Sequence, residues 1–375
     1  MKKILIIPHH PIQPNLKMRL VEIAKQLSKG YDIFVLSWSI VEDRHSLYAR
    51  TLFSLRDAFT KTKVYRNGLL KIVQFPVLRR PLCLVPLFNS FWLRRFAEKE
   101  KIDAVINGSY YMFNTRGKRA FRYIFDVADL PAAQTETPFE KFIYRQVRNE
   151  LEKADAITVS SRGLKDYITK EFGKESFFIP NGADINKIRS LSPWEIARVR
   201  RRYGLIDKWA IGYIGNVGNW MNMDLLIKVF KEVKKNIKQA SLLIAGYCPD
   251  YIRRRYASED VVFTGAVNTD EIDAYFSAID LGVMPSKKSR FQDLAFHLKA
   301  IEFTAARKFI VSTPREEMKL LNFPNVIFAD EEENAWAAAI VKARQMRWDD
   351  RWDSLVNDYD WHKISQKFAD IININ

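Results

Sequence analysis

Cysteine is scarce in this chain, and long apolar runs are missing. Only two cysteines, Cys83 and Cys248, occur among the 375 residues, and they stand far apart. Two isolated thiols exclude a disulfide framework and a cysteine-based metal cluster, which fits a reducing compartment. No apolar stretch reaches the roughly 20 residues that a membrane-spanning helix needs. We therefore expect a globular cytoplasmic protein.

The first eight residues also lack the features of a secretion signal. Two lysines precede the apolar run Ile4 to Ile7, but that run has only four residues and ends at Pro8. A signal peptide needs an apolar core of about 7 to 15 residues. The segment therefore predicts the first strand of a domain.

Charge is abundant and unevenly distributed. The net charge is +16, and residues 1–182 alone hold 31 Lys and Arg against 18 Asp and Glu, a net charge of +13. A basic surface attracts nucleic acid, anionic lipid or a phosphorylated substrate, and charge alone does not choose among them. The apolar content of 47% indicates a folded rather than a disordered chain.

Short apolar runs alternate with helix-like segments in the first half. The residues from Leu16 to Leu27 repeat with helical spacing. The strand-like runs are Lys3 to Ile7, Tyr31 to Ser37, Ile72 to Phe75, Ala104 to Ile106, Tyr123 to Asp126 and Ala156 to Ser160. This alternation predicts a parallel sheet covered by helices on both faces.

A second set of alternating runs follows a charged stretch at residues 193–208. Three of its strand-like runs end at Gly215, Gly246 and Gly265, and glycine permits close approach of the backbone to a ligand. Ligands of such sheets bind beyond the carboxyl ends of the strands. We predict an α/β protein with two doubly wound parallel-sheet domains that face a cleft, and a boundary between residues 183 and 208.

The segment from His297 to Thr313 is the most informative part of the chain. Lys299 and Glu302 are three residues apart, which places both on one face of a helix. A helix start that offers a cation and a carboxylate suits a ligand with both phosphate and hydroxyl groups. The alternative is an ordinary surface ion pair, which is common and weakly stabilising.

Several motifs then occur in a recognisable order. They are Tyr123 to Asp129, Glu152 to Ser161, Ile179 to Asp184, Tyr213 to Trp220, Leu243 to Gly246, Val262 to Val267 and Ala278 to Ser286, followed by the segment from His297. In this order the chain resembles the retaining glycosyltransferases of the GT-B fold, specifically a divergent member of the "group 1" family (family four). The resemblance is strongest from residue 211 to residue 313.

The resemblance implies transfer of a sugar from a nucleotide diphosphate sugar to a glycan or lipid-linked acceptor, with retention of the anomeric configuration. It implies no metal and no cofactor besides the donor substrate, because cations and helix N-termini neutralise the diphosphate. It also implies an acceptor-binding Rossmann-like domain over residues 1–183 and a nucleotide-sugar-binding Rossmann-like domain over residues 184–357. A terminal helix over residues 358–375 would return to the first domain.

By this resemblance Glu302 holds the ribose hydroxyls and Lys299 neutralises the diphosphate. The whole set of predicted donor-binding residues is Gly215, Asn216, Gly265, Arg290, His297, Leu298, Lys299 and Glu302. Two features depart from the family pattern. Leu294 stands where the first of two glutamates is expected, with His297 or Asp293 as substitutes, and the stretch from Asn216 to Asn222 has no Arg or Lys.

Asp126 ends a predicted strand of the first domain, and Asp129 follows it. Relatives place an acidic residue or histidine at this point, beside the acceptor hydroxyl. A carboxylate there would act as a general base or orient the acceptor, and we predict a catalytic role for one of the two. The alternative is an aspartate that caps the next helix. His9 and His10 are better explained as loop residues than as acceptor ligands.

Apolar and aromatic residues between Arg79 and Arg95 are bracketed by arginine pairs. This pattern is typical either of a membrane-interface segment or of a core helix with a cationic edge. The sequence leaves both interpretations open. With the basic first half, a membrane-interface segment would suit a lipid-linked acceptor and a cytoplasmic protein held peripherally on the anionic inner face of the cell membrane.

Two other functions compete with sugar transfer. A basic nucleic-acid-binding protein is disfavoured because the aromatic residues lie within apolar runs rather than among Lys and Arg, so we expect no nucleic acid partner. A nucleotide-sugar epimerase would keep the fold, but the linker-like motif and the Lys299 and Glu302 pair favour transfer.

Overall fold

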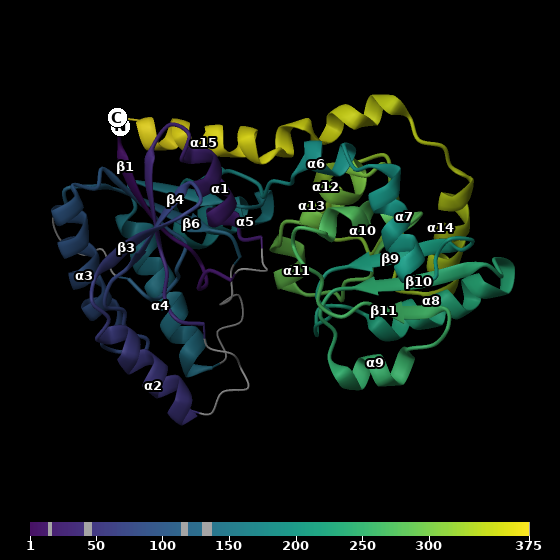
Figure 1. The fold of residues 1–375 in the computed structure, drawn as a ribbon, viewed down its shortest axis with the longest axis horizontal. Helices are drawn as coiled ribbons and strands as arrows, with labels where there is room; N and C mark the ends of the chain where they lie inside the picture. The colour runs from purple at the N-terminus through teal and green to yellow at the C-terminus, as the bar shows by residue number, and fades with distance from the viewer. Residues whose placement is uncertain (14–16, 41–46, 114–118, 130–136, 375) are drawn as a thin grey trace. The chain divides into compact units, whose positions relative to one another are not determined.

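The computed structural model describes residues 1–375 except 14–16, 41–46, 114–118, 130–136 and 375 (Figure 1). Its contacts divide the chain into two units. Unit 1 comprises residues 1–181 and 361–375, and unit 2 comprises residues 182–360. Both units are α/β, and each is built on its own sheet of mainly parallel strands, as predicted.

Unit 1 has an eight-stranded sheet in the order β3-β4-β2-β1-β5-β6-β7-β8. Its strands are β1 (Lys3–Ile7), β2 (Asp32–Leu36), β3 (Lys63–Asn67), β4 (Leu70–Gln74), β5 (Ala104–Asn107), β6 (Arg122–Val127), β7 (Ala156–Val159) and β8 (Phe177–Phe178). Among the described strands of this sheet, only the β3–β4 pair is antiparallel. Because the chain leaves β1 toward β2 and later returns to its other side at β5, the strand order reverses between β1 and β5.

The helices of unit 1 are α1 (Arg19–Leu27), α2 (Leu47–Ala58), α3 (Val85–Glu100), α4 (Pro138–Lys153), α5 (Arg162–Phe172) and α15 (Trp361–Asn373). The terminal helix α15 packs against α1 and places Ile364 and Phe368 in the same core as Ile4 of β1 (Figure 1). Burial of these apolar side chains explains why the end of the chain belongs to unit 1.

Unit 2 has a six-stranded parallel sheet in the order β11-β10-β9-β12-β13-β14. Its strands are β9 (Trp209–Ile214), β10 (Ala240–Ala245), β11 (Val261–Phe263), β12 (Leu281–Met284), β13 (Phe309–Ser312) and β14 (Val326–Phe328). Alternate residues of β10 enter different cores, with Leu242 in one and Leu243 in the other. Both faces of the sheet are therefore covered, and the strand order reverses between β9 and β12.

The helices of unit 2 are α6 (Ile185–Arg189), α7 (Pro193–Arg202), α8 (Met223–Asn236), α9 (Asp250–Tyr256), α10 (Ile272–Ala278), α11 (Arg290–Leu294), α12 (Leu298–Ala305), α13 (Glu316–Leu321) and α14 (Glu333–Gln345), with a 3-10 helix over Asp350–Tyr359. Helices α8 and α14 contribute to one core, and α10 and α12 to the other. In the described residues no helix is both long and apolar enough to span a bilayer.

The charged stretch that we expected near the domain boundary is helix α7, inside unit 2. Ser192 and Glu195 form a capping box at its start, and Val199 faces the core. The charges lie on the solvent side of an amphipathic helix, so this stretch is a helix of unit 2 and not a linker. Sequence periodicity also missed helix α2 and strand β3.

Candidate functional site

A cavity of about 280 Å³ opens in unit 2 where the strand order reverses. It lies at the carboxyl ends of β9 and β12, which is where open α/β sheets bind ligands. The residues that line it are Tyr213, Trp220, Met221, Met284, Pro285, Ser286, Gln292, Ala295, Phe296, His297, Leu298, Lys299 and Glu302. Four of the predicted donor-binding residues therefore meet in one cavity: His297, Leu298, Lys299 and Glu302.

Helix α12 places these residues because its other face is apolar. Ala300, Ile301 and Phe303 are fully buried in the core of unit 2. Their burial fixes the rotation of the helix, so Lys299 and Glu302 line the cavity one turn apart. His297 is the N-cap residue of this helix. The predicted helix start is thus present.

Lys299 extends over the aromatic ring of Tyr213. Its Nζ lies 4.7 Å from the ring centroid and 3.4 Å from the Tyr213 hydroxyl oxygen. That hydroxyl donates to the backbone oxygen of Asn216 at 2.9 Å. Among the described residues, no carboxylate lies within salt-bridge distance of Lys299. The Lys299 ammonium makes a cation–π contact and faces a cavity, and this arrangement suits an anionic ligand.

Gly215 makes room for the Lys299 side chain. Its φ is 135°, and a Cβ at this position would collide with the end of that side chain. The neighbouring loop is fixed by Asn216, whose Oδ1 accepts a hydrogen bond from the backbone N–H of Tyr247 at 3.1 Å. Gly215 and Asn216 therefore shape the loop against which the Lys299 side chain lies.

Replacing Gly215 with alanine should destabilise the loop by about 1 to 3 kcal/mol, because an L-residue is strained at this φ. It should also displace Lys299 and weaken nucleotide binding. Thermal unfolding and a nucleotide titration would measure both effects. Gly30→Ala is the matched control, since a Cβ there meets no atom within 4 Å. Equal behaviour of the two variants would contradict this role for Gly215.

Gly215 and Asn216 do not line the cavity themselves, and neither do the last two predicted donor-binding residues, Arg290 and Gly265. Arg290, the first residue of α11, is exposed. Gly265 pairs with Gly246, whose N–H donates to the Gly265 oxygen at 3.1 Å. Sequence reasoning missed Tyr213, Trp220 and Gln292, which do line it. The only signal for them was their position beside strand ends or the α12 segment.

In unit 1, Asp126 is fully buried in an ion pair with Arg19. Arg19 Nε lies 3.0 Å from Asp126 Oδ2, and Arg19 Nη2 lies 3.1 Å from Oδ1. The Thr158 hydroxyl also donates to Oδ1 at 2.6 Å. Arg19 further donates to the backbone oxygens of Ile179 and Pro180. The pair thus joins α1, β6, β7 and the segment after β8.

This environment disfavours the predicted role of Asp126 as a proton acceptor. Burial alone would raise its pKa, but the charges of Arg19 and His9 and the hydrogen bonds from Arg19 and Thr158 hold the pKa below its usual value. A carboxylate with a low pKa and no exposed surface accepts protons poorly. Asp126 is better explained as a residue that positions its neighbours.

Asp129 lies just beyond the end of β6 and is exposed. Protein atoms nevertheless crowd its carboxylate, and this desolvation raises its pKa to about 6. The hydroxyl of Tyr110 bonds to the Asp129 backbone, accepting from its N–H at 2.8 Å and donating to its carbonyl oxygen. Asp129 is therefore the accessible carboxylate of the two that we predicted.

His9 stands beside Asp126 and Tyr110. Its Nε2 lies 3.2 Å from the Asp126 backbone oxygen, and its ring meets the Tyr110 ring edge-on at 5.9 Å. Burial lowers the pKa of His9 to about 4, so the ring is neutral at physiological pH. His9 lies in the bend after β1, as predicted, and its ring packs at the carboxyl edge of the sheet.

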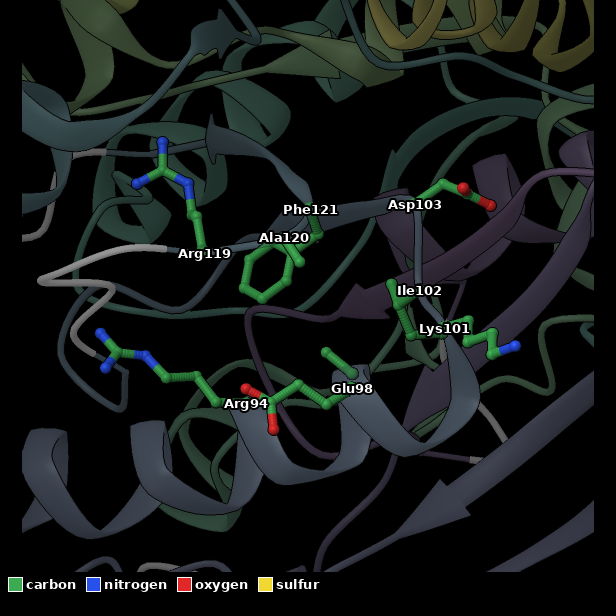
Figure 2. Close-up of a pocket in the computed structure, with 9 residues that line it drawn as sticks. Arg94, Glu98, Lys101, Ile102, Asp103, Arg119, Ala120 and Phe121 are labelled. Atoms are coloured by element: carbon green, nitrogen blue, oxygen red, sulfur yellow. The ribbon is translucent and has the colours of Figure 1, made fainter.

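A larger cavity of about 580 Å³ lies elsewhere in unit 1 (Figure 2). Its lining comes from the end of α3, including Arg94 and Glu98, and from the segments before β5 and β6, including Asp103 and Phe121. It is at the amino ends of these strands and shares no residue with either site described above. Among the described residues, no three His, Cys, Asp or Glu side chains cluster as a metal ion would require.

Comparisons with known proteins agree with these features. The sequence model of the family "Glycosyl transferases group 1" matches residues 208–345. The chain is 22% identical to the uncharacterized glycosyltransferase MJ1069 of Methanocaldococcus jannaschii, over 98% of this chain and 97% of that protein. It is 28% identical to a GDP-mannose-dependent alpha-(1-6)-phosphatidylinositol monomannoside mannosyltransferase of Mycolicibacterium smegmatis, over 40% of each chain.

Among solved structures, Anabaena Alr3699/HepE in complex with UDP-glucose superposes with a TM-score of 0.69 at 14% identity, over 99% of both chains. This likeness shows the fold. The family match covers the unit that holds the Lys299 cavity, and the similarity to MJ1069 extends over nearly the whole chain. Residues 208–345 therefore match the group 1 glycosyltransferases, and the chain as a whole has the GT-B fold.

Proposed function

We propose that this glycosyltransferase uses a nucleotide diphosphate sugar, binds it in the cavity of unit 2 without a metal ion, and transfers the sugar with retention of configuration. One observation carries the proposal. The Lys299 ammonium faces a cavity at the strand-order reversal, one turn away from Glu302. Among the described residues, Lys299 forms no ion pair with a carboxylate.

In this proposal each part of the donor has its own partner. The diphosphate lies against Lys299 and the positive end of the α12 dipole, which neutralise its charge. Glu302 accepts hydrogen bonds from the two ribose hydroxyls. A cation and a helix N-terminus then supply the stabilisation that a divalent ion provides in other enzymes.

The relatives support a nucleotide-sugar donor and leave the base open. The Anabaena protein was solved with UDP-glucose, and the Mycolicibacterium relative is named for GDP-mannose. Calorimetric titration with UDP-, GDP- and ADP-sugars in EDTA tests the proposal. We expect one of them to bind with the same affinity in EDTA and in magnesium. Failure of all three to bind, or binding only with magnesium, would contradict it.

We further propose that Asp129 accepts the proton of the acceptor hydroxyl or orients it. A carboxylate with a pKa of about 6 is protonated below that pH and inactive as a base. Transfer should therefore rise between about pH 5 and pH 7, with half of the rise near pH 6. Asp129→Asn should lower kcat at least tenfold and remove this rise. An unchanged pH profile in this variant would exclude the role.

A lipid-linked acceptor on an anionic membrane fits the surface of α3. Leu84, Leu87 and Phe91 follow helical spacing and are 51%, 67% and 58% exposed. Arg94 and Arg95 come one turn later, where they would reach anionic headgroups. We propose that this face lies in the membrane interface.

Sedimentation with vesicles tests this face. The unaltered protein should bind phosphatidylglycerol-rich vesicles and not neutral ones, because both apolar and cationic groups contribute. The Leu87→Ser, Phe91→Ser double variant should lose most of that binding. Phe139→Ser, at an exposed phenylalanine of α4, is the control. Retained binding in the double variant would argue against α3.

A further inference from the structure

The imidazole of His297 is an unusual group in the cavity. It lines the cavity and is only 8% exposed, yet its Nε2 has no hydrogen-bond partner among the described residues. A buried polar atom without a partner destabilises the folded protein. A bound ligand that supplies the missing hydrogen bond would explain why this nitrogen has no partner in the protein.

The state of the ring defines what that ligand must offer. Burial, reinforced by the nearby charge of Lys299, lowers the pKa of His297 to about 4, so the ring is neutral near pH 7. The Gln292 backbone acts in the opposite direction and raises the pKa, but burial outweighs it. We assign the single proton of the neutral ring to Nδ1, which leaves the unpartnered Nε2 as an acceptor. Nε2 then needs a donor such as a hydroxyl, and a phosphate oxygen does not serve.

The order of residues along α12 indicates which hydroxyl. His297 precedes Lys299 by two residues and Glu302 follows it by three. At about 1.5 Å per residue, the two hydroxyl-binding groups are roughly 7 Å apart along the axis, on either side of the cation. In a nucleotide diphosphate sugar the diphosphate likewise stands between the ribose and the transferred sugar. Ribose at Glu302 therefore directs the transferred sugar toward His297.

We propose that His297 Nε2 accepts a hydrogen bond from a hydroxyl of the transferred sugar and so helps to select that sugar. This inference rests on the proposed donor site. The inference also gives His297 a role that Leu294 cannot have, because the aliphatic side chain of Leu294 makes no hydrogen bond. His297 is a specificity-determining residue here and takes no part in the transfer step.

The test compares two ligands on one variant. His297→Phe keeps the size and aromaticity of the ring and removes its nitrogens. It should weaken binding of the sugar nucleotide about tenfold, the value of one hydrogen bond, and leave binding of the matching nucleotide diphosphate unchanged. His362→Phe, at an exposed histidine of α15, is the control. His297→Gln keeps a polar group and should recover part of the loss.

Deoxy-sugar donors identify the hydroxyl. The unaltered protein should lose affinity for the one analogue that lacks it, and His297→Phe should no longer distinguish that analogue from the full donor. Equal loss for both ligands, or no loss, would overturn the inference while the donor site stands. If the unaltered protein bound no sugar nucleotide, the proposed function would fall, and the inference with it.

Discussion

Replacing Lys299 with methionine should weaken binding of the nucleotide diphosphate by about ten- to a hundredfold. Methionine keeps most of the aliphatic chain above Tyr213 but removes the charge, and a hydrogen bond to a charged group contributes about 1.5 to 3 kcal/mol. Glu302→Ala should have an effect of the same order, because the ribose hydroxyls lose a charged acceptor. Isothermal titration calorimetry would give both dissociation constants.

These two variants should differ in what they recognise. Loss of Lys299 should hardly alter binding of a nucleoside without phosphates, whereas loss of Glu302 should weaken it. Lys319→Met, at a lysine of α13 that pairs with Glu316, is the control for removal of a positive charge from unit 2. Unchanged nucleotide affinity in both site variants would show that the donor binds elsewhere.

Replacing Arg19 with methionine should lower the free energy of unfolding of unit 1 by about 3 to 5 kcal/mol. The substitution leaves the Asp126 carboxylate buried without its cation, and removing one partner of a buried pair costs this much. Urea denaturation followed by circular dichroism would measure it. Lys25→Met, which breaks an exposed pair with Glu22, should cost far less.

The pH dependence of stability provides an independent check on this pair. The pKa of Asp126 is lowered in the folded state, so its stabilising contribution is present above the ordinary aspartate pKa of about 4 and is lost as the pH falls further. Arg19→Met should remove this acid-dependent loss. A cost below about 1 kcal/mol, with an unchanged acid response, would contradict the structural role of Asp126.

The sequence predicted the features that depend on local patterns. Short apolar runs marked β1, β9 and β12, and the spacing of Lys299 and Glu302 placed both on one side of α12. A strand or a helix turn is encoded by neighbouring residues, so a single sequence suffices to find it. The cavity beside Lys299 could be anticipated because the reversal of strand order brings such segments together.

Features that depend on distant residues could not be predicted. The burial of Asp126 is decided by Arg19 and Thr158, which are 107 and 32 residues away along the chain. The contact between Lys299 and Tyr213 spans 86 residues. Neither separation leaves a periodic signal in the sequence. This is why the sequence alone did not show that Asp126 is buried beside Arg19.

The most direct test of the donor site is a crystal structure with the sugar nucleotide that the protein binds, grown in EDTA. We predict the diphosphate against Lys299 and the first N–H groups of α12, the ribose on Glu302, and the sugar hydroxyl on His297. A donor bound at another cavity of the protein, or one whose diphosphate is held only when magnesium is restored, would contradict the account.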